Sequence, residues 1–90
     1  MATGVIRNVQ FTRLMKVEGK FREFNFRKMG INSEGQFTVD TADDRGNRIV
    51  FAMSKDNDTW KFINTNFPVW ISQNETKLHE IIEEELSLLQ

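Results

Sequence analysis

Residues 5–29, VIRNVQFTRLMKVEGKFREFNFRKM, contain two alternating segments joined by Glu18-Gly19, and this pattern decides the fold. In the first segment the apolar residues share one parity, interrupted by Arg7 and Arg13: Val5, Val9, Phe11, Met15 and Val17. A period of two with β-branched residues is typical of a strand that has one buried face. The spacing of the valines also allows a helix, which stays open as the alternative. We predict a long first strand that ends at a tight turn.

The second segment, Lys20–Met29, alternates Phe24 and Phe26 with charged and polar residues, while Phe21 falls on the opposite parity. Three further runs alternate in the same way, at residues 36–40, 49–53 and 60–63. Segments rich in Asn, Asp, Ser and Gly separate the runs, and such residues favour turns and hairpin loops. The pattern therefore predicts a meander of about five antiparallel strands.

A single helix is expected after the last strand, from Pro68 to about Leu88. Proline suits the first turn of a helix, and Thr65 or Asn66 could cap it. At 100° per residue, one apolar arc collects Trp70, Ile71, Leu78, Ile81, Ile82, Leu86 and Leu89. The opposite side collects Thr76, Glu80, Glu83 and Glu84. Glu85 lies inside the apolar arc, where it could face a cation of a strand.

The fold class that follows is α+β, with a meander-like antiparallel sheet of about five strands and one C-terminal amphipathic helix packed on it. Residues 1–90 are expected to form one domain, because a chain of this length supports one core. This order of elements resembles that of pleckstrin-homology-like domains and of the repeats of purine-rich-element-binding proteins. The resemblance concerns topology alone and assigns no residue a role.

Composition favours a protein of the cytoplasm that is not an enzyme. The chain has no cysteine, hence no disulfide and no thiolate nucleophile. We expect no targeting peptide and no membrane-spanning segment. No nucleophile motif or glycine-rich phosphate loop is present in the sequence, so neither a catalytic residue nor a cofactor is predicted.

Two clusters could suggest a metal, and neither predicts one. His79 lies four residues from both Glu75 and Glu83, so the three side chains share one flank of the expected helix. An isolated histidine with such neighbours more simply describes a helix flank than a set of metal ligands. The aspartates near residues 43 and 56 lack the spacing of a calcium loop and suit hairpin turns.

Charge is divided unequally along the chain. Residues 1–30 contain seven lysines and arginines against two acidic residues, whereas residues 31–90 contain five against eleven. Four of the early cations lie among phenylalanines, at Lys20, Arg22, Arg27 and Lys28. Cations mixed with aromatic rings are typical of surfaces that bind single-stranded nucleic acid. The alternative is that the phenylalanines belong to the core and these cations pair with the acidic helix within the fold.

The leading functional hypothesis is a non-enzymatic interaction domain that binds a protein partner or a second copy of itself as a homodimer. Trp70, at the margin of the apolar arc, is a possible interface anchor because tryptophan is enriched at binding hot spots. Binding of single-stranded nucleic acid through Lys20, Arg22, Arg27 and Lys28 is the alternative. A further alternative is a small apolar ligand between sheet and helix, lined by Phe51, Trp60 and Phe62.

Overall fold

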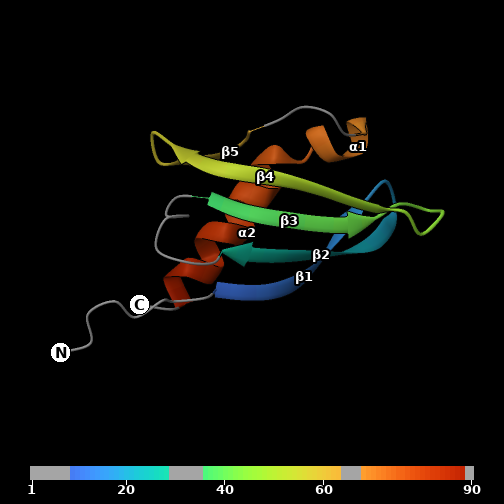
Figure 1. The fold of residues 1–90 in the computed structure, drawn as a ribbon, viewed down its shortest axis with the longest axis horizontal. Coiled ribbons are helices and arrows are strands. Elements are labelled where there is room, and N and C mark those ends of the chain that lie inside the picture. The colour runs from blue at the N-terminus through green and yellow to red at the C-terminus, as the bar shows by residue number, and fades with distance from the viewer. Residues whose placement is uncertain (1–8, 29–35, 64–67, 89–90) are drawn as a thin grey trace.

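The computed structural model of this chain describes residues 9–28, 36–63 and 68–88 (Figure 1). Within them, five strands and two helices follow one another: β1 (Val9–Val17), β2 (Lys20–Lys28), β3 (Gln36–Ala42), β4 (Arg48–Asp56), β5 (Thr59–Phe62), α1 (Val69–Ser72) and α2 (Glu75–Leu88). The strands form an antiparallel sheet whose spatial order, β1-β2-β3-β4-β5, is the order along the chain. The predicted α+β meander with a C-terminal helix is confirmed.

The first segment is a strand and not the helix that the valine spacing also allowed. β1 pairs with β2 from Val9 opposite Lys28 to Val17 opposite Lys20. The turn between them has two central residues, Glu18 and Gly19, with φ values of 51° and 81°. Positive φ at both positions suits a two-residue hairpin, because the twist of such a turn matches that of the strands. Residues 5–8 of the expected strand lie outside the described residues.

Two further hairpins, whose turns lie within the described residues, use the expected turn chemistry. Between β3 and β4, the Oδ1 atom of Asp43 accepts hydrogen bonds from the backbone N–H groups of Asn47 at 2.8 Å and Arg45 at 2.9 Å. The bond from Asn47 is the main reason that the pKa of Asp43 lies below its ordinary value. Between β4 and β5, Asn57 and Asp58 both have positive φ. β5 is thus joined to β4 by a second two-residue turn.

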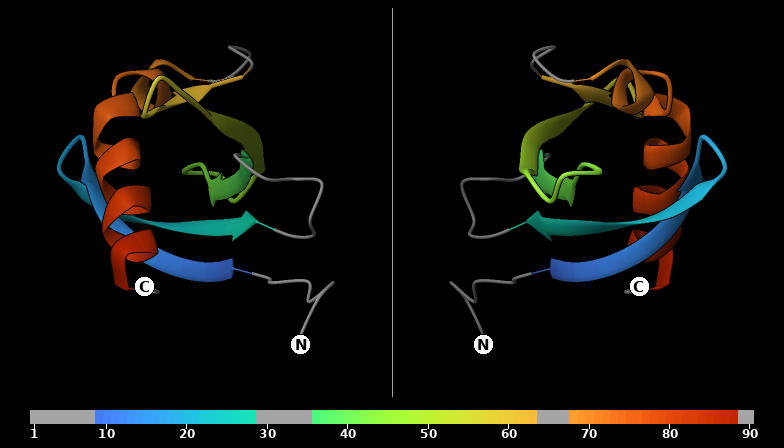
Figure 2. Two further views of the ribbon diagram at one scale, coloured as in Figure 1. Left: turned by 90° about the vertical axis from the view of Figure 1, so that its left-hand side faces the viewer. Right: turned by 90° about the vertical axis from the view of Figure 1, so that its right-hand side faces the viewer.

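One face of the sheet provides most of the core. The buried apolar residues that form it are Val9, Met15, Val17, Phe24, Phe26, Phe37, Val39, Phe51, Met53, Trp60, Ile71, Leu78 and Ile82. The alternation predicted for the strands is therefore correct in phase. The sheet is strongly curled, and α2 lies across the opening of the curl (Figure 2). Stacked and edge-on aromatic pairs fill the interior, among them Phe11 with Phe26 at 4.7 Å and Phe37 with Trp60 at 5.3 Å between ring centroids.

The C-terminal helix is divided into two, which the apolar pattern did not predict. In an uninterrupted helix, the N–H of Asn74 would donate to the carbonyl of Trp70. Instead the side-chain amide of Asn74 donates to that carbonyl at 2.6 Å, and its backbone N–H donates to the carbonyl of Ile71 at 2.9 Å. Asparagine competes for backbone groups in this way, and α1 ends there. The proposed caps Thr65 and Asn66 lie outside the described residues.

The phase predicted for the helix holds on its apolar side. Leu78 and Ile82 are fully buried, and Ile81 and Leu86 are partly buried against the same core. Glu80 is exposed, as expected.

Replacing Leu78 with alanine should lower the free energy of unfolding by about 2 to 5 kcal/mol, because the change removes buried methyl groups and leaves a cavity. Glu80→Ala is the matched control and should be nearly silent. Urea unfolding of both variants tests this. Equal losses of stability would contradict the packing of α2 described above.

Candidate functional site

The outer edge of β5 is covered by side chains of α2. Because the β4–β5 turn has two residues, the N–H groups of Trp60 and Phe62 point away from β4. The N–H of Trp60 donates to Nδ1 of His79 at 3.0 Å, and the N–H of Phe62 donates to Oε2 of Glu75 at 2.9 Å. The indole N–H of Trp60 donates to Oε2 of Glu83 at 2.8 Å. Three acceptors of α2 thus satisfy three donors of β5.

These acceptors are the three residues whose spacing raised the question of a metal. Glu75, His79 and Glu83 do share one flank of α2, as predicted, and this flank faces β5. Nδ1 of His79 is occupied by the hydrogen bond from the backbone of Trp60. The described residues hold no group of three or more side chains arranged to bind a metal ion. The expectation that Glu83 points away from the sheet was wrong, because Trp60 and Lys55 draw it toward β5 and β4.

The outer edge of β1 differs from that of β5. The two-residue turn at Glu18-Gly19 makes the odd-numbered residues of β1 bond to β2, so the backbone groups of the even-numbered residues face outward. These residues are Gln10, Thr12, Leu14 and Lys16. No backbone or side-chain hydrogen bond covers this edge from within the described part of the chain. The described structure therefore has one covered edge and one open edge.

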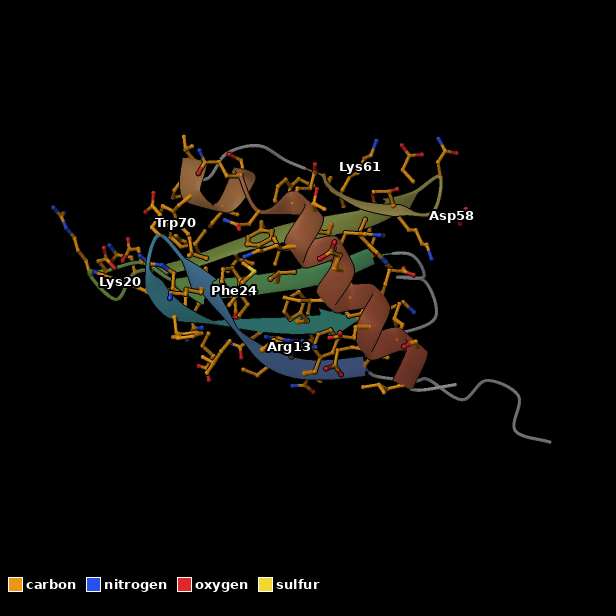
Figure 3. The ribbon with its side chains drawn as sticks, turned by 180° about the vertical axis from the view of Figure 1, so that it is seen from behind. Arg13, Lys20, Phe24, Asp58, Lys61 and Trp70 are labelled. Carbon is orange, nitrogen blue, oxygen red and sulfur yellow. The ribbon has the colours of Figure 1, made fainter. Side chains whose placement is uncertain are left out.

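A pocket lies between β1 and α2, beside the open edge. Its volume is about 220 Å³, and it is lined by Arg13, Met15, Lys77, Glu80, Ile81 and Glu84. Figure 3 shows the face on which Arg13 and α2 lie close together. Its lining combines the apolar side chains of Met15 and Ile81 with charged side chains from β1 and α2.

Arg13 joins β1 to the C-terminal half of α2. Its guanidinium donates to Glu84 at 2.7 Å and to Glu85 at 2.9 Å. The hydrogen bond to Glu84 is the main reason that the pKa of Arg13 lies above its ordinary value. The expectation that Glu85 faces a cation of a strand is confirmed. Arg13, on the inward-facing side of β1, therefore pairs with two acidic residues of α2. Its position in the sequence did not predict these partners.

The four cations considered for nucleic acid do not meet the acidic helix. Lys20 and Arg22 lie beside Asp44, at 3.6 Å and 2.9 Å, and Arg27 lies 3.9 Å from Asp40. These aspartates belong to β3 and to the loop that follows it. Lys28 is partly buried at the end of β2, opposite Val9 on β1. Three of the four cations therefore have acidic neighbours on β3 or on the loop after it, and whether the four bind a ligand stays a prediction.

Trp70 is partly buried and lies against Arg22. The Arg22 guanidinium carbon is 4.2 Å from the centroid of the Trp70 ring, a distance that permits a cation–π interaction. The Arg22 side chain is only 10% exposed. This contact connects α1 to β2 and to the β3–β4 loop, so Trp70 has a packing partner inside the fold. Its role as an interface anchor stays a prediction.

The three residues suggested for an apolar ligand site are close together. Phe51 and Trp60 are buried, and the ring of Phe62 packs edge-on against Phe51 with centroids 5.5 Å apart. The pocket described above lies elsewhere, beside β1. Ligand binding at these rings also stays a prediction.

A comparison of the chain with models of protein families, with curated protein sequences and with solved structures finds no significant match. Among the described residues, neither helix has the length and apolar character that crossing a lipid bilayer requires.

Reversing Arg22 to glutamate should destabilise the protein by about 1 to 3 kcal/mol, because the change removes a cation from Trp70 and places a carboxylate beside Asp44. Lys61→Glu is the matched control, since Lys61 is exposed and forms no ion pair with the described residues. Urea unfolding measures both. If the two variants lost the same stability, the contact of Arg22 with Trp70 would have no structural role.

The stabilising effect of Glu83 should depend on pH. Its hydrogen bonds with Lys55 and then with Trp60 hold the pKa of Glu83 below its ordinary value. A lowered pKa adds stability at neutral pH, and that stability is lost as the pH falls through the lowered pKa. Glu83→Gln should therefore cost stability near neutral pH and less at about pH 3. A cost that is equal at both pH values, measured by urea unfolding, would contradict this role.

Proposed function

We propose that this chain is a non-enzymatic protein-interaction domain that binds an extended segment of a protein partner as an additional strand beside β1. The observation that carries the proposal is the contrast between the two edges of the sheet. At β5, side chains of α2 accept the outward N–H groups of the strand. At β1, the outward backbone groups have no such partner within the described residues.

An unpaired strand edge offers a row of backbone donors and acceptors, and proteins usually cover or interrupt such edges. Addition of a partner strand uses these groups for affinity and uses neighbouring pockets for specificity. The pocket between β1 and α2 provides space of that kind, with the apolar side chains of Met15 and Ile81 and the charged groups of Lys77 and Glu80. A segment that lies along β1 would place alternate side chains toward this pocket.

Exposed apolar side chains near the edge of β1 also favour a protein partner. Leu14 is 65% exposed in the middle of β1, and Phe21 is 69% exposed on the neighbouring strand. Both lie on the outward face of the sheet, diagonal to each other across the β1–β2 pair. Apolar surface next to unpaired backbone groups suits contact with another polypeptide better than contact with a phosphate backbone.

The absence of cysteine from the sequence supports a place for this domain in the reducing cytoplasm, because a small domain without disulfides suits that compartment.

The test uses two substitutions at Thr12, whose N–H faces outward. Thr12→Pro removes the N–H from the edge, whereas Thr12→Ala removes the same hydroxyl and keeps the N–H. Peptides selected from a displayed library for binding to the wild-type chain should bind Thr12→Ala normally and Thr12→Pro at least about tenfold more weakly. Circular dichroism of both variants confirms that they fold.

Equal binding of the selected peptides to both variants, or a selection that yields no binder, would contradict strand addition. Nucleic-acid binding is measured in parallel by the fluorescence anisotropy of labelled single strands. A signal that falls with salt at a log–log slope of about −2, as expected for three neutralised phosphates, would favour the nucleic-acid function instead. Its loss on reversing Lys20 and Lys28 to glutamate would assign it to the basic strands.

A further inference from the structure

We infer that the strand received at the edge of β1 is β1 of a second copy of this chain. The two copies pair antiparallel about a two-fold axis at Leu14. The inference rests on the proposed function, because it identifies the partner of the same edge. In the resulting dimer the two five-stranded sheets form one continuous sheet, and the pockets between β1 and α2 flank the junction.

Pairing of β1 with β1 produces a closed dimer that no third copy can join. Each copy has one edge covered by α2 and one edge open among the described residues. Antiparallel pairing of β1 with β1 uses the open edge of both copies at once, so a third copy has no edge to join. A domain with two open edges would instead add copies without limit.

The side chains of β1 also determine the register in which the two copies pair. The outward-facing backbone groups belong to even-numbered residues, so the two-fold axis can lie at Thr12, Arg13 or Leu14 with most of β1 paired. An axis at Arg13 would place two arginines directly opposite each other, which is unfavourable. An axis at Thr12 would place the apolar side chain of Leu14 opposite Gln10. An axis at Leu14 places it opposite its equivalent, which removes apolar surface of both copies from water.

The Leu14 register also satisfies the remaining positions of β1. Thr12 lies opposite Lys16 of the second copy on the outward face, and Arg13 lies opposite Met15 of the second copy on the inward face. No two like charges are directly opposite. Leu14 is also diagonal to Phe21 of its own copy on the same exposed face, so the exposed apolar side chains of both copies lie near the junction. This self-complementarity favours a second copy over an unrelated segment.

Sedimentation equilibrium of the full chain tests the inference. The wild-type protein should be a dimer at about ten to a hundred micromolar. Leu14→Lys places two like charges opposite each other at the axis and should weaken the dimer at least about tenfold. Val50→Lys is the matched control, because Val50 is 58% exposed on the same outward face but lies in β4. It should leave the dimer unchanged.

Thr12→Pro should also weaken the dimer, and Thr12→Ala should not. A wild-type chain that stays monomeric at hundreds of micromolar would overturn the inference, and so would a dimer that Leu14→Lys leaves intact. Neither result decides the proposed function, which is tested by whether displayed peptides distinguish Thr12→Pro from Thr12→Ala. If peptides do so while the protein is monomeric, the edge receives a different protein. If they do not, strand addition itself is wrong.

Discussion

The row of hydrogen bonds between α2 and the outer edge of β5 is the constraint on which the rest of the structure depends. A sheet that does not close into a barrel has two edges, and unpaired backbone groups at an edge need partners. Here Glu75, His79 and Glu83 accept from β5 at successive turns of one helix. This fixes which flank of α2 meets β5 and therefore which residues, Leu78 and Ile82, enter the core.

The same constraint explains why the opposite side of α2 meets β1 through Arg13. Once the first turns of the helix are held at β5, its C-terminal half crosses the curled sheet toward β1 (Figure 2). The ion pairs of Arg13 with Glu84 and Glu85 hold it there. They are made by side chains, so the backbone edge of β1 has no partner among residues 9–28, 36–63 and 68–88, and a pocket lies beside it. The covered and the open edge are thus two consequences of one helix position.

Much of the fold was predictable because its signals are local. The period-two runs of β1, β2 and β4 and the two-residue turns define strands whose buried faces were assigned correctly. The break at Asn74 was missed because it depends on one side chain competing for one carbonyl. The spacing of four between Glu75, His79 and Glu83 predicted that they share one flank of α2. Their partners on β5 were not predicted, because Trp60 and Phe62 donate through backbone N–H groups, which every residue except proline has.

The site was less predictable than the fold because its contacts join residues that are far apart in the sequence. The basic cluster suggested by composition has acidic neighbours on β3 and the loop after it, a pairing that only the register of the sheet creates.

The difference between the two edges is most directly measured by residue-resolved amide hydrogen exchange of the Leu14→Lys variant at low concentration. The account predicts slow exchange for Trp60 and Phe62 and fast exchange for Thr12 and Lys16. Equally slow exchange at all four residues would contradict it, because the edge of β1 would then be covered within a single chain.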